Sequence, residues 1–487
     1  MTDLEHRSVH FAIQKLNENA KRLGDSYAIE WADGTMTYSS LRAAVYESAR
    51  QLHETGVRPS AVIAIRAERS RQLLIQLLAA WSVEAIPALI DNTLPEAYVR
   101  RCEQSIGAGW RLTGATSMVI ESLGDGSPVS GFDGASHILF TSGTTAAPSA
   151  VVASRSSLEE AMNWYGEYFS PTADDRVGLM SGLGHDPILR DLLVPLLSGG
   201  TLVIPDTNIL AAPRRAADFV SDQRISILHC TPALLELCAL STRAPQSWNS
   251  VRLILCGGAP LAVTLATVVL ERTRGRLFNV YGATETPQIV SCFEVRRDDS
   301  LNANFSTVPI GTGVGNATVG LVPVSADTED LTGDEIVVTS SHLAMGFVSV
   351  DDDSSVRLKA LSESPAKGTY HTGDLGSLRG DGQLRVVGRI ESSFSINGQR
   401  ISRQMVEESA LAYPGVHLAR ARVEELGGRS RLSLAVAIDP NVSFGITGLR
   451  EYLERLLPPF GVPRQIEIVE RNQLDPNLKI ATNSRRA

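Results

Sequence analysis

Apolar runs of strand length alternate with longer stretches of helical spacing between residues 61 and 280, and this alternation restricts the possible folds more than any other feature. The runs at 61–65 and 86–90 have the length of buried strands, and 70–80 repeats apolar residues at helical spacing. Alternation with short connections is typical of doubly wound parallel sheets. Further expected strands lie at 138–140, 177–180, 201–204, 225–228, 253–255 and 277–280, and expected helices at 188–197, 213–222, 233–240 and 261–272. We predict an α/β fold that binds ligands beyond the carboxyl ends of its strands.

The pattern changes after residue 310, where short strands such as 335–338 and 383–387 are separated by turns. This change indicates a small β subdomain. From about residue 392 to the end, helical spacing near 402–413 and 447–457 indicates a compact α/β tail. We therefore expect a large N-terminal domain with doubly wound parallel sheets and a small β subdomain, followed by a small α/β C-terminal domain.

Charge and cysteine content restrict the partners and the compartment. A net charge of −9 argues against nucleic acid or an anionic membrane as a partner, because both require a positive field. The five cysteines are scattered without a CxxC pair, which fits reduced thiols better than disulfides or a zinc site. Residues 1–20 lack a continuous apolar core, and the apolar window 251–270 is interrupted by glycine and proline. We expect a soluble, cytoplasmic protein.

A loop rich in hydroxyl groups follows the expected strand at 138–140. Its small side chains leave the backbone N–H groups accessible, so such a loop can hold a polyphosphate. An ordinary turn is the alternative for this segment taken alone. The residues that would donate to phosphate are Thr141, Ser142, Gly143, Thr144 and Thr145.

Three later segments give this loop a context. They are Tyr-Gly-Ala-Thr-Glu-Thr at 281–286, His-Thr-Gly-Asp at 371–374 with Gly388-Arg389, and Lys479 near the C-terminus. In this order the segments resemble those of AMP-forming adenylating enzymes, the superfamily of acyl-CoA synthetases and of adenylation domains of nonribosomal peptide synthetases. Taken singly, Tyr281 would be a core aromatic residue, Asp374 a turn residue and Lys479 a solvated lysine. Their shared order over most of the chain favours the functional interpretation.

The resemblance implies two domains joined by a hinge, which falls at Glu391. We expect a large adenylate-forming domain at residues 1–390 and a small, mobile C-terminal domain at 391–487 that rotates about the hinge. No carrier-protein serine motif follows, so we expect any phosphopantetheinyl carrier to be a separate chain.

The resemblance also implies that the chain uses ATP and Mg²⁺ to form an acyl-adenylate. Thr284 would donate to the α-phosphate, Glu285 would hold Mg²⁺ together with phosphate and water oxygens, and Lys479 would be the mobile catalytic cation. The other nucleotide contacts would come from Tyr281 stacked on adenine with Gly282 beside it, from Gly257, Gly258, Ala259 and Asn279 along the base, and from Asp374 and Arg389 at the ribose.

Several positions depart from the pattern of the resembled family, and four of them lie in functional loops. Ala146 and Ala150 replace glycines, Ser149 replaces the loop lysine, and Leu478 replaces the glycine before Lys479. Loss of the loop lysine removes a charge-assisted phosphate contact worth about 1.5–3 kcal/mol, which weakens ATP use without removing an acceleration of at least about 8 kcal/mol. The alternative is a degenerate protein of this fold that acts as a binding partner.

The segment 182–191, Gly-Leu-Gly-His-Asp-Pro-Ile-Leu-Arg-Asp, resembles the acyl-pocket segment of fungal α-aminoadipate reductases. Asp186 would bind the substrate ammonium, and Arg190, alone or with His229, would bind a second carboxylate. From local sequence alone, Arg190 could instead lie on the helix surface and pair with Asp191 or Asp186. Gln288 replaces an arginine of the aminoadipate pattern. The implied pocket positions are Asp186, Pro187, Arg190, His229, Ile254, Cys256, Val280, Gln288, Ile289 and Lys479.

We therefore expect an ATP-dependent, AMP-forming carboxylate ligase. It would be a stand-alone adenylating enzyme that activates an amino acid with a second polar or acidic group and passes it to the thiol of a carrier protein or to another thiol. Direct transfer to a small amine or another nucleophile is the alternative within the same chemistry.

Overall fold

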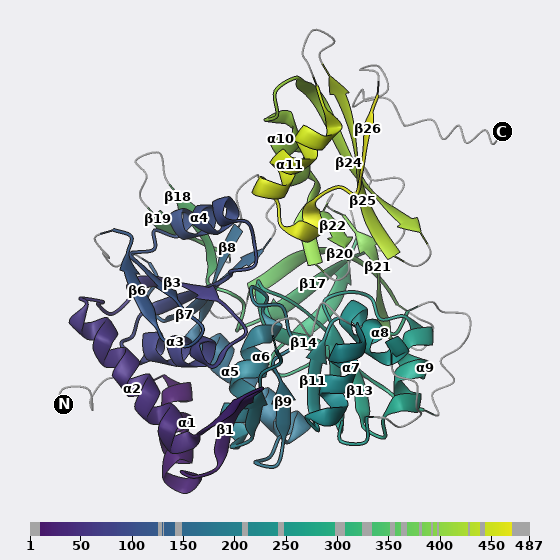
Figure 1. Ribbon diagram of the computed structural model, residues 1–487. Helices are drawn as coiled ribbons and strands as arrows, with labels where there is room; N and C mark the ends of the chain where they lie inside the picture. The colour runs from purple at the N-terminus through teal and green to yellow at the C-terminus, as the bar shows by residue number, and fades with distance from the viewer. Residues whose placement is uncertain are drawn as a thin grey trace. The chain divides into compact units, whose positions relative to one another are not determined.

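Figure 1 shows a computed structural model of the chain. The structure describes residues 10–124, 129, 131–141, 149–206, 213–241, 248–297, 307–323, 334–350, 356–361, 368–378, 382–390, 393–396, 399–426, 429–438 and 444–469. The chain divides into two compact units. The first comprises Met1–Asp91, Glu103–Phe140 and Ala150–Ile390, and the second Asn92–Cys102, Thr141–Ser149 and Glu391–Ala487. The division at residue 390 expected from the sequence assigns Asn92–Cys102 to the large domain, whereas this segment is grouped with the second unit.

One sheet of the first unit carries most of the candidate site residues. Its strand order is β15-β14-β13-β12-β11-β9-β10-β1-β2. The neighbours from β1 to β13 pair in parallel, whereas β2, β14 and β15 pair antiparallel at the edges. The strands are β1 (Tyr27–Trp31), β2 (Gly34–Thr37), β9 (Arg176–Gly178), β10 (Thr201–Val203), β11 (Ile227–Cys230), β12 (Leu253–Gly257), β13 (Arg276–Ala283), β14 (Thr286–Val295) and β15 (Thr312–Gly313).

Helices cover both faces of this sheet. On one face, α5 (Arg155–Phe169) and α6 (Pro187–Ser198) contribute Phe169 and Val194 to an apolar cluster with Leu255 of β12. On the other face, α7 (Pro213–Asp222), α8 (Pro232–Ser241) and α9 (Val263–Arg272) pack with Ile254 and Cys256 of the same strand. Successive residues of a strand point to opposite faces, so the two clusters separate neighbouring positions of β12.

A second sheet of this unit has the strand order β19-β18-β8-β7-β4-β3-β5-β6 and packs against the N-terminal helices. Its strands are β3 (Val62–Ala67), β4 (Ile86–Asp91), β5 (Trp110–Thr113), β6 (Val119–Ser122), β7 (Ala135–Thr141), β8 (Ser149–Ser154), β18 (Gly346–Val350) and β19 (Val356–Ala360). These helices are α1 (Phe11–Arg22), α2 (Tyr38–Glu54) and α3 (Arg71–Ser82), whereas most of α4 (Glu96–Ser105) belongs to the second unit.

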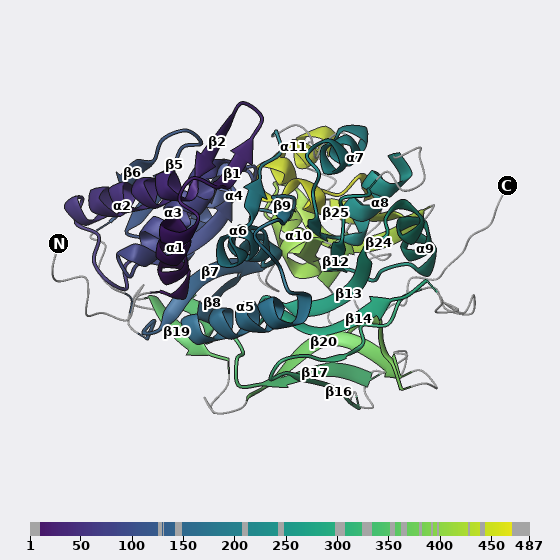
Figure 2. The ribbon, with the colours of Figure 1, turned by 90° about the horizontal axis from the view of Figure 1, so that it is seen from below.

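The small β subdomain predicted after residue 310 forms a third, antiparallel sheet of order β16-β17-β20-β21. Figure 2 shows it next to β14, which contacts β16. Its strands are β16 (Thr318–Val322), β17 (Asp334–Ser340), β20 (Gly368–Leu378) and β21 (Leu384–Arg389).

The second unit has its own sheets and helices. The strands β24 (Val416–Leu426), β25 (Arg429–Ile438) and β26 (Gln465–Ile468) form one sheet, and β22 (Ser393–Ile396) pairs with β23 (Gln399–Ser402). Helix α10 (Arg403–Leu411) packs against β24 and α11 (Ile446–Leu456), and a short 3₁₀ turn, η1 (Pro459–Gly461), follows. This agrees with the α/β tail expected from the sequence.

The α/β class is confirmed, and the structure adds antiparallel edges to the predicted parallel sheets. Helices α2, α4 and α5 were not predicted, because polar residues interrupt the apolar spacing in these segments. Within the described ranges, no helix is both long enough and apolar enough to cross a membrane.

Candidate active site

Helix α6 begins at the residues for which the sequence predicts substrate contacts. Pro187 occupies the first turn, where its fixed φ suits a helix start. Asp186 precedes Pro187, and Arg190 lies four residues after Asp186, so the Asp186 and Arg190 side chains lie on one face of the helix. The exposed fractions are 7% for Asp186 and 5% for Arg190. Arg190 is therefore not the surface residue that local sequence allowed, and its hydrogen bond within the described part of the chain goes to Gln288.

Gln288 of β14 bridges the carboxylate of Asp186 and the guanidinium of Arg190. Its Nε2 donates to Asp186 Oδ1 at 2.8 Å and to the Asp186 carbonyl oxygen at 3.1 Å. Its backbone N–H donates to Asp186 Oδ2 at 2.7 Å, and its Oε1 accepts from Arg190 Nη1 at 3.0 Å. A neutral amide thus joins the two buried charges that we expect to anchor a substrate.

Burial raises the pKa of Asp186 to about 6, although Arg190 and the Gln288 N–H groups oppose the shift. Between the unfolded pKa near 4 and this value, the folded state holds a proton that the unfolded state releases. We expect the free energy of unfolding to fall by roughly 2 kcal/mol from this group as pH rises from 4 to 7. Asp186→Asn should remove that slope when denaturant unfolding is followed at both pH values. The same slope in both proteins would contradict the assignment.

His229, the third residue of β11, has both ring nitrogens engaged inside the protein. Nδ1 lies 2.7 Å from Asp191 Oδ1, and Nε2 lies 2.9 Å from the Tyr165 hydroxyl. A carboxylate only accepts, so Nδ1 donates to Asp191 and Nε2 accepts from Tyr165. Burial lowers the pKa of His229 despite Asp191, which keeps the imidazole neutral. This bonding leaves no imidazole N–H for a substrate carboxylate, so we no longer assign that role to His229.

The chain Asp191–His229–Tyr165 ties α6, β11 and α5 together, and two of its members were not predicted. Asp191 Oδ2 also accepts from the backbone N–H groups of Met180 and Ser181, at 3.0 and 2.8 Å. The signal available in the sequence was an acidic residue, next to Arg190, within the largely apolar stretch of α6. Charged residues are seldom fully buried without partners, so such a position indicates a buried network.

The remaining acyl-pocket residues divide between the two faces of the sheet. Val280 and Ile289 pack in the cluster with α5 and α6, on the face where His229 bonds Tyr165 and Asp191. Ile254 and Cys256 pack in the cluster with α7, α8 and α9. The structure therefore separates Ile254 and Cys256 from the pocket that the resemblance assigned to them.

Asp374 of β20 lies where two of the predicted nucleotide contacts converge. Its Oδ2 accepts from the Tyr281 hydroxyl at 2.7 Å, and its Oδ1 accepts from Arg389 Nη1 at 2.5 Å. Strand register places Asp374 directly opposite Arg389. Arg389 Nε is buried and has no acceptor among the described residues, so this donor fits a ligand oxygen such as a ribose hydroxyl.

Several residues predicted to contact the adenine base also have structural roles within the chain. A Cβ at Gly282 would lie 2.1 Å from the Gln288 carbonyl oxygen, and one at Gly257 would lie 2.5 Å from the Val280 carbonyl oxygen. Gly258 has a φ of +84°, and Ala259 follows it at the end of β12. Asn279 donates to the carbonyl oxygens of Val308 and Pro309, at 3.2 and 2.8 Å. The Asn279 amide therefore holds a neighbouring segment in place.

Thr284 and Glu285 form the turn between β13 and β14, with 7% of Glu285 exposed. The Glu285 carbonyl oxygen accepts from the Ala344 N–H at 2.9 Å. No three His, Cys, Asp or Glu side chains cluster in the described ranges. Mg²⁺ is commonly held by one carboxylate with phosphate and water oxygens, so Glu285 fits the role of a single protein ligand.

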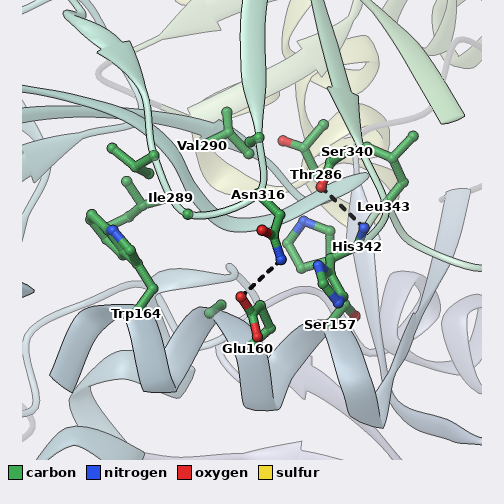
Figure 3. Close-up of a pocket in the computed structure, with 15 residues that line it drawn as sticks. Ser157, Glu160, Trp164, Thr286, Ile289, Val290, Asn316, Ser340, His342 and Leu343 are labelled. Atoms are coloured by element: carbon green, nitrogen blue, oxygen red, sulfur yellow. Dashed lines mark hydrogen bonds between the residues drawn. The ribbon is translucent and has the colours of Figure 1, made fainter. Parts of the chain in front are cut away.

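A pocket opens beside this turn (Figure 3). One wall is α5, with Glu160 and Trp164, and the other includes β14. Glu160 accepts from the Asn316 amide at 3.0 Å across the pocket. The β14 residues in its wall, Thr286, Pro287, Ile289 and Val290, flank Gln288 on both sides.

Some predicted site residues lie outside the described part of the chain. These are Ser142, Gly143, Thr144 and Thr145 of the hydroxyl-rich loop, the hinge residue Glu391 and Lys479, together with the departing residues Ala146 and Leu478. Thr141 ends β7 and Ser149 begins β8, so the described strands flank the loop on either side.

Comparison with known proteins gives one family match. The family described as AMP-binding enzyme matches residues 16–126 and 128–348. Tyrocidine synthase 3 of Brevibacillus parabrevis is 24% identical over 96% of this chain, which spans only 7% of that relative.

Solved structures give fold matches. The adenylation domain AlmE of Vibrio cholerae, in complex with glycyl-adenosine-5'-phosphate, has a TM-score of 0.78 at 18% identity and covers 95% of each chain. The amide bond synthetase McbA of Marinactinospora thermotolerans has a TM-score of 0.76 at 19% identity, over 94% of this chain and 95% of its own. At these identities the structural matches show a shared fold.

Proposed function

Because this chain belongs to the AMP-binding enzyme family, we propose that it is an ATP-dependent, AMP-forming ligase that activates an amino acid with a second polar or acidic group. The observation that supports this substrate class is the buried pair of opposite charges, Asp186 and Arg190, on one face of α6. A free amino acid carries an ammonium that pairs with a carboxylate, and an acidic side chain pairs with a guanidinium.

Arg190 supports an acidic or strongly polar side chain on the substrate. Its Nη1 donates to Gln288, while its Nε is buried without an acceptor among the described residues. An unpaired buried guanidinium donor is costly, so a ligand that supplies an acceptor gains affinity relative to an aliphatic one. Glutamate, aspartate and 2-aminoadipate share the required groups.

The proposed reaction joins the substrate carboxylate to the α-phosphorus of ATP and releases pyrophosphate. Asp374 and Arg389 would orient the ribose, and Tyr281 would lie against the adenine. Thr284 would donate to the α-phosphate, Glu285 would hold the divalent ion, and Lys479 would neutralise the developing negative charge. A bound Mg²⁺ would supply charge neutralisation for the departing pyrophosphate.

We further propose that the acyl group passes to a phosphopantetheine thiol of a carrier protein. The thiol would attack the acyl carbon, and AMP would leave. The match to tyrocidine synthase 3 supports a peptide-synthetase setting, whereas the fold match to an amide bond synthetase favours an amine acceptor as the second candidate. Product masses with a phosphopantetheinylated carrier, and with small amines in its place, separate the two.

The primary test is pyrophosphate exchange with purified protein, ATP, Mg²⁺ and a panel of amino acids. We expect exchange with at least one acidic amino acid and much weaker exchange with norleucine, which has a similar length and no second polar group. No exchange with any acid from a folded sample would overturn the proposed activity.

The loop residues Ala146, Ser149 and Ala150, which replace the family's glycines and lysine, favour a different function. In that case the chain is a binding protein that retains the fold without the chemistry. Calorimetric titration with ATP distinguishes it. The ligase requires ATP binding that is lost in Asp374→Ala, because the ribose would lose its carboxylate acceptor. A wild-type protein that fails to bind ATP but binds a carrier protein would support the function as a binding protein.

A further inference from the structure

Gln288 adopts an unusual backbone conformation for a glutamine in a strand. Its φ is +70°, in the left-handed region that costs a residue with a Cβ about 1–2 kcal/mol. The residue is 4% exposed and lies in β14 three residues after Glu285. Strained buried residues persist where the surrounding structure holds them, and they are concentrated at functional sites.

The hydrogen bonds of Gln288 account for this conformation. Its backbone N–H and its side-chain amide together occupy both carboxylate oxygens of Asp186, and the amide oxygen occupies Arg190 Nη1. The amide N–H therefore stands at the oxygen where a substrate ammonium would bind. The amide oxygen stands where a second polar group of the substrate would accept from the guanidinium.

We propose that Gln288 is an internal ligand that fills the substrate pocket when it is empty and that every substrate must displace. The proposal rests on the proposed function of Asp186 and Arg190 as the two anchors of the substrate. Breaking the hydrogen bonds of Gln288 would thereby lower the affinity of every substrate. A substrate with both anchoring groups replaces the hydrogen bonds at both ends of the amide, whereas a neutral amino acid replaces only the one at Asp186.

Displacement requires room for the released side chain. Pro287 and Ile289, on either side of Gln288, line the pocket shown in Figure 3. Gln288 itself does not line that pocket, so its released side chain would reach this space only if the backbone of the segment turned. A rotation of this segment out of its strained conformation also regains part of the cost of the left-handed φ.

The test uses Gln288→Gly and Gln288→Ala in the full chain. Glycine tolerates the positive φ, so Gln288→Gly removes the amide and relieves the backbone strain, whereas Gln288→Ala removes the amide and keeps the strain. Gln76→Ala is the matched control, because Gln76 is another buried amide, 2% exposed, that donates to the Thr113 carbonyl oxygen at 3.0 Å far from this pocket.

Binding of glutamate, aspartate, 2-aminoadipate and norleucine is measured by thermal shift without ATP, and KM by pyrophosphate exchange. If substrates displace Gln288, its removal strengthens the binding of every substrate by the same factor, at least about tenfold, because the amide makes two charge-assisted hydrogen bonds. The preference for acidic over neutral substrates then stays unchanged, and Gln76→Ala alters neither the affinity nor this preference.

Two results would overturn the proposal. Weaker binding of the acids in both Gln288 variants would show that Gln288 is a direct substrate contact. A gain confined to acidic substrates would show that Gln288 stays in place and only shields Arg190. Thermal shifts need no turnover, so absence of exchange in the wild type would refute the proposed activity and leave the binding result to decide the role of Gln288.

Discussion

Replacing Asp191 with alanine is expected to lower the free energy of unfolding by about 4 kcal/mol, because the change leaves several buried donors without acceptors. The donors are the Met180 and Ser181 backbone N–H groups and His229 Nδ1–H. Asp191 is fully buried, so water cannot replace the lost carboxylate. Denaturant unfolding followed by circular dichroism measures the loss.

Asp191→Asn provides the matched control. The Asn oxygen can accept from the two backbone N–H groups, and its amide can donate to His229 Nδ1 once the imidazole changes tautomer and donates from Nε2 to Tyr165. We therefore expect asparagine to cost about 1–2 kcal/mol. Equal losses for alanine and asparagine would show that the charge of Asp191, and not its acceptor geometry, stabilises this part of the sheet.

Replacing Arg190 with alanine is expected to lower kcat/KM for an acidic amino acid by about 2–5 kcal/mol, or about 30- to 4000-fold, if the ion pair with the substrate is desolvated. Arg190 is 5% exposed and its Nε has no acceptor among the described residues, so its site is dry enough for a large effect. A neutral amino acid should lose much less, since it offers no second acceptor. Pyrophosphate exchange with glutamate and norleucine gives both values.

Arg190→Lys separates charge from geometry. Lysine retains a positive charge but lacks the planar fork that binds a carboxylate in a bidentate manner, so its activity with the acid should lie between the wild type and Arg190→Ala. Equal losses for acidic and neutral substrates in Arg190→Ala would rule out carboxylate recognition and assign Arg190 to the scaffold.

The sequence alone was sufficient to predict the class of fold and the order of the site segments. Strand and helix periodicities are local, so Ile86–Asp91, Arg71–Ser82 and Pro213–Asp222 were predicted close to their observed bounds. The segments at 281–286, 371–374 and 388–389 singled out Tyr281, Asp374 and Arg389 before any contact among them was known, and strand register then brings Asp374 and Arg389 together.

Only the tertiary structure decided which of the candidate side chains meet. His229 was expected at a substrate carboxylate, but α5 and α6 bring Tyr165 and Asp191 to its two nitrogens. Ile254 and Cys256 belong to the opposite face of their strand, because their side chains pack with α7–α9. Each of these contacts joins residues far apart in the chain, and local patterns carry no information on such partners.

The hydrogen bonds among the acyl-pocket residues could also be known only from the tertiary structure. From the sequence, Gln288 was only a replacement for an arginine at one pocket position. Its left-handed φ and its bonds to Asp186 and Arg190 arise because β14 lies antiparallel to β13 while α6 presents both charges on one face. Residue identity determined which charges the pocket could hold, whereas the packing of α6 on the sheet determined that they are bridged by an amide from within the chain.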